Sequence, residues 1–242
     1  MSGISTEKLN FLPKSSELRQ ICKSISTLEA ILCQDWEYRY YSYQKDWGEN
    51  EEVCEMRNGE GDQMLILFAK EGTCINGFAH ESRMNGWKKV EVQEKKSFAE
   101  KLFGTKKEVK TKLIQEIPFG ILEGLPKVFN EFIFGEPVKS IGTTFCIWQI
   151  RHDEEWKVGE IKLPDDDYKD GSKDLLKLLD GNTLTYKNWA EEYYEIELKQ
   201  ELIEDVFNGK EITDELIKGL NPELEDKEKL RSDLEEIGYG LK

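Results

Sequence analysis

The chain has 242 residues, of which 38% are hydrophobic and 34% are charged, and its formal net charge is −15 at pH 7. Nucleic-acid binding needs clustered Lys and Arg to neutralise phosphates, so this charge argues against a nucleic-acid partner. It is typical either of a protein whose charge maintains solubility, which is the interpretation we favour from composition alone, or of one whose partner is basic. The aromatic fraction of 11% excludes an intrinsically disordered chain.

The cysteine usage and the hydropathy pattern indicate a reducing compartment. The cysteines form no Cys-x-x-Cys pair and are odd in number. Residues 1–13 lack the basic segment and apolar run of a signal peptide, and no apolar stretch approaches the roughly 20 residues that span a bilayer. We therefore expect a cytoplasmic protein without a membrane partner, whose thiols pack in the core: Cys22, Cys33, Cys54, Cys74 and Cys146.

The first predicted element is a helix over residues 15–33. Ser15 or Ser16 can cap its start, and Glu17 places a carboxylate in the first turn, where the helix dipole favours it. Apolar residues recur at spacings of three and four and form one broad buried stripe: Leu18, Ile21, Cys22, Ile25, Leu28, Ile31 and Leu32.

Residues 36–43 change the period to two, which predicts a strand. Aromatic residues at this density suit a pleated surface better than a helix. The alternation places Trp36, Tyr38 and Tyr40 on one side, and Glu37, Arg39 and Tyr41 on the other.

Residues 63–78 form the centre of the predicted sheet. Two apolar runs, Met64–Ala69 and Thr73–Phe78, flank a short connection whose Gly72 can adopt the positive φ of a tight turn. Met64–Phe68 has no polar break, so both of its faces should be covered, as in a central strand. Short connections rich in Gly, Asn and Asp join this hairpin to two preceding strands, which predicts an antiparallel meander.

Residues 88–112 carry a local positive charge, with nine lysines and four glutamates. A basic patch for nucleic acid or an anionic membrane, a solvated segment, and a contact with the acidic tail are the alternatives for this stretch. We expect a mobile or inserted loop. Within it and just beyond, Trp87–Val92 allows a short strand, and Phe98–Phe103 and Val109–Ile117 allow short helices.

The remaining elements define the fold class. Strands at Thr143–Ile150 and Trp156–Ile161 extend the sheet, because neither could bury its apolar face alone. We predict an α+β fold, in which an antiparallel sheet of about six strands is packed by an N-terminal helix and by C-terminal helices. Residues 1–164 form the sheet domain, and residues 165–242 form an acidic helical region docked on it. Residues 153–242 alone carry a charge of −14.

The chain has two histidines, and no recognised catalytic motif surrounds either of them. Because Glu81 and Ser82 follow His80, the candidates for a polar site are His80, Glu81 and His152. The alternative role is hydrogen bonding at strand ends.

The sequence gives little support for a metal site or a cofactor site. Asp165–Gly171 resembles a calcium loop, but in one register Tyr168 and Lys177 occupy positions that need oxygen donors, and the other register misplaces the glycine. Paired Cys or His spacings for zinc and glycine-rich phosphate loops are missing from the sequence. We therefore expect no metal and no cofactor.

The most suggestive feature is a group of aromatic residues close together in the sequence. Tyr and Trp among acidic residues are typical of a binding patch. We expect one face of the sheet to pack helices and the other to present Tyr41 and Tyr43; the alternative is that helices cover both faces. The candidate binding residues are Tyr38, Tyr40, Tyr41, Tyr43 and Trp47.

Five runs together resemble bacterial α+β proteins of the toxin-immunity type: Tyr38–Tyr43, Met56–Gly61, Leu65–Phe68, Gly77–Ser82 and Thr144–Trp148. The resemblance covers residues 15–200, includes no diagnostic catalytic motif and implies a cytoplasmic binding protein. With the acidity and the aromatic patch, it favours a non-enzymatic protein that occludes a basic toxin, for example a nuclease. The alternatives are an enzyme with a carboxylate and histidine site, and a small-molecule sensor or scaffold.

Overall fold

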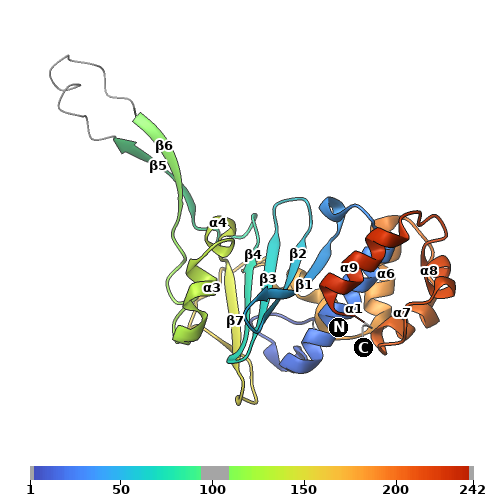
Figure 1. Cartoon of the computed structure of the whole chain (residues 1–242). Helices are drawn as coiled ribbons and strands as arrows, with labels where there is room; N and C mark the ends of the chain where they lie inside the picture. Colours follow the sequence, from blue (N-terminus) through green and yellow to red (C-terminus); the bar gives the residue numbers. More distant parts are fainter. Residues whose placement is uncertain (1–2, 94–108, 240–242) are drawn as a thin grey trace.

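The computed structural model describes residues 3–93 and 109–239. Its centre is a six-stranded sheet in the order β1-β2-β3-β4-β7-β8, in which all neighbouring strands are antiparallel (Figure 1). This arrangement confirms the predicted α+β class and the meander extended by a later strand pair. The strands are β1 (Tyr41–Gly48), β2 (Glu51–Arg57), β3 (Gln63–Ala69), β4 (Gly72–Phe78), β7 (Phe145–Ile150) and β8 (Lys157–Val158).

The hairpin of β3 and β4 lies in the interior of this sheet, as its apolar sequence predicts. Met64 to Phe68 are all buried, and alternate residues belong to the hydrophobic clusters on opposite faces. Gly72 begins β4 where the backbone of β7 passes closely, because a Cβ at this position would lie 2.2 Å from the Gln149 carbonyl oxygen. Only glycine fits such an approach.

Helices cover the first face of the sheet. The predicted N-terminal helix is α1 (Ser15–Leu32), and it packs against β1, α7 and α9. The C-terminal helices share one core with α1 and the sheet (Figure 1). They are α5 (Ser172–Leu175), α6 (Thr183–Tyr194), α7 (Gln200–Phe207), α8 (Asp214–Leu220) and α9 (Lys227–Ile237). Helix α6 ends before α7 begins because Glu195 adopts a left-handed conformation with φ of 55°.

A smaller layer covers the second face. Residues 116–141 supply α3 (Asn130–Phe134) and α4 (Val138–Ile141), which bury Phe129 and Ile133 against apolar residues of β2, β3, β4 and β7. Within the described chain, no β1 residue belongs to this second cluster. The outer part of this face therefore lacks an apolar cover. Short 3-10 turns complete the chain: η1 (Leu9–Phe11), η2 (Trp36–Tyr38), η3 (Lys127–Phe129) and η4 (Lys177–Asp180).

Strands β5 (Trp87–Gln93) and β6 (Val109–Gln115) form a separate two-stranded ribbon that projects from the body (Figure 1). Its base is fixed because the Trp87 indole N–H donates to the Ile141 carbonyl at 3.1 Å and the Glu116 N–H to the Gly86 carbonyl at 3.0 Å. The helix expected over 109–117 is wrong, since pairing with β5 selects a strand there. The helix expected over 98–103 lies outside the described residues.

Candidate functional site

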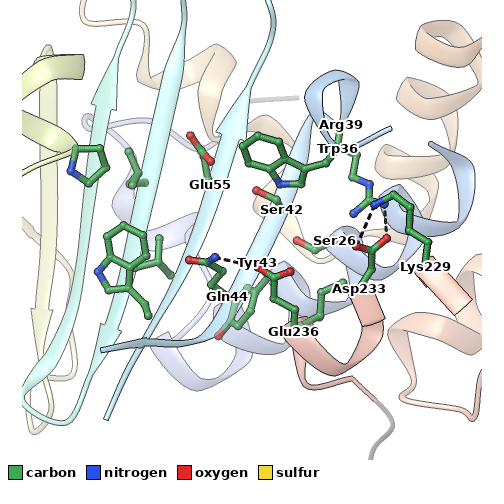
Figure 2. Close-up of a pocket in the computed structure, with 15 residues that line it drawn as sticks. Ser26, Trp36, Arg39, Ser42, Tyr43, Gln44, Glu55, Lys229, Asp233 and Glu236 are labelled. Carbon is green, nitrogen blue, oxygen red and sulfur yellow. Dashed lines mark hydrogen bonds and ion pairs between the residues drawn. The ribbon is translucent and has the colours of Figure 1, made fainter. Parts of the chain in front are cut away.

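A groove of about 500 Å³ runs along the edge strand β1, from the part of the second face that α3 and α4 leave uncovered to α1 and α9 (Figure 2). Side chains of β1, β2 and β3 form its floor, α9 forms one wall, and Pro137 also lines it. The floor combines apolar Val53 and Leu65 with polar Ser42 and Gln44. The groove therefore offers both apolar surface and hydrogen-bonding groups.

Two indoles line the rim of the groove. Trp36 is 46% exposed and Trp47 is 39% exposed, which is high for large aromatic side chains. The Arg57 guanidinium lies 4.1 Å from the centre of the Trp36 ring, in a cation–π contact that holds this indole in place. Exposed indoles held at the edge of a cavity are typical anchors for a binding partner.

An ion pair closes the end of the groove near α9. The Arg39 guanidinium donates to the Asp233 carboxylate at 2.5 Å and also to the carbonyls of Cys33 at 2.7 Å and Gln34 at 3.2 Å. Lys229 lies 3.6 Å from the other oxygen of Asp233. Arg39 is only 5% exposed, so this pair has a structural role and joins the start of the sheet to the last helix.

Two further carboxylates face the groove. Glu236 accepts a hydrogen bond from the Gln44 side chain at 2.9 Å (Figure 2). Glu55 accepts one from Gln63 at 2.5 Å and lies 3.7 Å from Arg57. The lining thus holds three carboxylates against two cations, and both cations contact Asp233. Because Arg57 pairs with Glu55, Glu236 is the lining carboxylate that has no cation within 4 Å among the described residues, and it favours a positively charged ligand.

The predicted tyrosine patch is only partly exposed. Tyr41 is 1% exposed and Tyr43 is 3% exposed, and both belong to the core beneath α1, so the expectation that they are presented to solvent is wrong. Tyr40 is half-buried among Trp189 and Tyr193. Of the five candidates, the buried Tyr43 and the exposed Trp47 line the groove, whereas Tyr38 is exposed outside it.

Of the candidate polar residues, His80 and Glu81 lie together, but His152 is not brought near them. His80 follows the end of β4 and its Nδ1 lies 2.8 Å from Asp62, while Nε2 lies 3.9 Å from Glu81. His152 lies at the other end of the sheet, because Gly72 at the start of β4 pairs with Ile150. Both histidines are exposed on the surface, and neither lines a described pocket.

Asp62 is the centre of a hydrogen-bonded cluster around His80. Its carboxylate accepts from the His80 N–H at 2.8 Å, from the Asn58 side chain at 3.0 Å and from the Tyr168 hydroxyl at 3.2 Å. Burial and the nearby Asp62 charge raise the pKa of Tyr168 above its ordinary value. These contacts orient the imidazole and also tie the β2–β3 connection to the C-terminal region.

A buried carboxylate lies beneath the aromatic cluster on the helical side. Glu29 is fully buried and accepts hydrogen bonds from the hydroxyls of Tyr186 at 2.8 Å and Tyr194 at 2.7 Å, and from the Tyr40 N–H at 3.0 Å. Burial raises the pKa of Glu29 above 4.5, although the hydrogen bonds of Tyr194, Tyr186 and the backbone oppose the shift. Because these partners enclose Glu29, its role is structural, within the core.

The acidic turn that resembles a calcium loop has a structural use. The Asp170 carboxylate is 3% exposed and accepts from the Ser172 N–H at 3.0 Å, the Ser172 hydroxyl at 2.6 Å and the Thr6 hydroxyl at 2.5 Å. The turn therefore fixes the start of the chain. Across residues 3–93 and 109–239, no group of three or more His, Cys, Asp or Glu side chains has the spacing of a metal site.

Comparison with known proteins found no match to a family model, to a curated protein or to a solved structure. In the described part of the chain, none of the helices is long and apolar enough to cross a membrane.

Of the residues that line the groove, the sequence singles out only Tyr43 and Trp47. Its polar members on the helices and on the segment before β1 are not predicted: Ser26, Arg39, Asp233 and Glu236. The sequence predicts helices in the C-terminal region but not the strand beside which α9 packs. Trp36 carries a signal in the sequence, because acidic residues flank it on both sides. It precedes β1, which begins at Tyr41, so this strand does not cover its indole.

Proposed function

We propose that this chain is a non-enzymatic binding protein that engages a basic protein partner through the groove beside β1. The observation that carries the proposal is the pair of exposed indoles, Trp36 and Trp47, at the rim of a cavity whose Glu236 carboxylate has a neutral amide as its partner. Interfaces concentrate their binding energy in such aromatic anchors. A basic partner is favoured because the chain carries a net charge of −15, which accelerates encounter with a positive surface.

The partner class that we propose is a basic toxin, which this protein would neutralise by covering its active surface. The motivation is the resemblance of the strand sequences to immunity-type proteins together with the acidic groove. Occlusion of this kind needs shape and charge on the surface and no bond-making side chain.

Affinity purification from the native host tests the proposal. The wild-type chain should retain a basic protein, Trp47→Ala should retain much less of it, and the purified partner should lose its own activity when the wild type is added. A partner retained equally by both chains, or one whose activity is unaffected, would count against the proposed role.

A second candidate function is acid–base catalysis at His80, because Asp62 orients its Nδ1 at 2.8 Å while the ring remains solvent-accessible. The same arrangement positions the histidine of many hydrolases. A screen of ester and phosphoester substrates would test it: an activity lost in His80→Asn supports this candidate, and an inactive wild type argues against it.

A further inference from the structure

The inner end of the groove contains an unpartnered polar group. Ser26 of α1 lines the groove and is 1% exposed, and its hydroxyl has no hydrogen-bond partner among the residues that the structure describes (Figure 2). Buried polar groups are nearly always hydrogen-bonded, because leaving one unpaired is unfavourable. A ligand that reaches this hydroxyl would satisfy it.

Of the two α9 carboxylates that line the groove, Glu236 is less neutralised than Asp233. Asp233 is bound by Arg39 and lies near Lys229, whereas Glu236 has a neutral amide, Gln44, as its hydrogen-bond partner. No cation within 4 Å of Glu236 is found in the described chain. A positively charged group entering the groove can therefore pair with Glu236 without displacing an existing ion pair.

The walls of the groove suit a planar cation on an apolar stem. Arg57 already lies over Trp36 at 4.1 Å, which demonstrates that this indole accepts a guanidinium on one face. Trp47 is exposed at the rim, and Val53 and Leu65 supply apolar floor for methylene groups.

Resting on the proposed function, we propose that the groove binds an arginine side chain of the partner protein. The stem lies along Val53 and Leu65, one face of the guanidinium meets an indole of the rim, and its N–H groups donate to Glu236 and to the Ser26 hydroxyl. Arginine fits better than lysine because its rigid fork presents five donors and stacks on aromatic rings.

The test uses Nα-acetyl-arginine N-methylamide as the probe, with the citrulline analogue as its uncharged isostere. NMR titration follows the indole N–H signals of the folded full-length chain, assigned to Trp36 and Trp47 with Trp→Phe variants. The arginine compound should shift both signals saturably, and the citrulline compound should bind at least about tenfold more weakly. Equal shifts with both compounds, or none, would overturn the proposal.

Two variants separate this site from general charge effects. Glu236→Gln should weaken the arginine probe several-fold, whereas Glu235→Gln, an exposed neighbour on α9 outside the groove, should leave the affinity unchanged. Ser26→Ala should also weaken binding while the unfolding midpoint stays at or above the wild-type value, because the lost hydroxyl has no partner in the free protein. Equal weakening by Glu235→Gln and Glu236→Gln would contradict a specific arginine site.

The same variants distinguish this inference from the proposed function. If a partner is retained through Trp47 but the arginine probe does not bind, the proposed function stands and the arginine assignment is wrong. If the probe binds but no partner is retained, the groove recognises arginine and the proposed function fails.

Discussion

Arg39 and Asp233 are 194 residues apart in the sequence, and their side chains meet at 2.5 Å at the end of the groove. The pair joins the segment before β1 to the last helix, and Arg39 satisfies two further carbonyls with its remaining donors. The wall of the groove therefore depends on a contact between the segment that precedes β1 and helix α9.

Removing one partner of this pair should destabilise the fold. Asp233→Ala leaves the guanidinium of Arg39 buried beside carbonyl groups without its carboxylate, and we expect a loss of about 3 kcal/mol in the free energy of unfolding. Urea denaturation measures it. Replacing both residues, as in Arg39→Met with Asp233→Leu, should recover a large part of the loss; a single variant with an unchanged midpoint would show that the pair contributes nothing.

Because of Glu29, the free energy of unfolding should fall as the pH rises. Because burial raises its folded-state pKa above 4.5, its stabilising contribution is complete below pH 4.5 and is lost as the pH rises through the folded-state pKa. Tyr186→Phe removes a donor to the charged form, so this variant should lose about 1–3 kcal/mol near neutral pH and less at low pH. Tyr38→Phe, exposed and outside this cluster, is the control. A loss independent of pH would contradict the role of Tyr186.

Glu52 should produce the opposite pH dependence. Burial raises its pKa, but the hydrogen bonds of Lys23 and Tyr43 and the charges of Lys23 and Arg19 outweigh burial, so the pKa lies below 4.5. The resulting stabilisation is present above pH 4.5 and is lost as the pH falls through the folded-state value. Glu52→Gln should therefore cost on the order of 1 kcal/mol at pH 7 and approach the wild type in acid. Thermal unfolding at several pH values would show it, and curves that stay parallel would refute it.

Gly77 should not tolerate a side chain. A Cβ at this position would lie 2.1 Å from the Phe145 ring on the neighbouring strand, so Gly77→Ala should lose about 1–3 kcal/mol through overpacking. Gly3→Ala, where nothing lies within 4 Å, is the control. Combining Gly77→Ala with Phe145→Leu should restore part of the stability, and no difference between the two glycine variants would exclude this clash.

Much of the fold could be predicted because its signals are local. The unbroken apolar run Met64–Phe68 identifies the central strand, and the stripe of residues 15–33 gives α1 within one residue at its end. The error at Tyr41 and Tyr43 has a physical origin. Residues 36–38 form a 3-10 turn and the strand starts at Tyr41, so the side of the sheet that α1 covers could not be read from alternation alone.

The groove could be predicted only in part for a similar reason. Trp47 was found because aromatic density is visible in one short stretch. Asp233 and Glu236 reach β1 through the packing of α9, and no local pattern reports which strand a distant helix will meet. The buried ion pair of Arg39 with Asp233 depends on the same packing of α9.

The most direct test of the proposed function is isothermal titration of the purified partner with the double variant Trp47→Ala/Glu236→Lys. Losing one aromatic anchor and reversing one charge should weaken the affinity by about 100-fold or more relative to the wild type. Leu184→Ala, an exposed apolar residue away from the groove, should bind like the wild type. If the double variant binds the partner as tightly as the wild type, the groove beside β1 is not the binding surface.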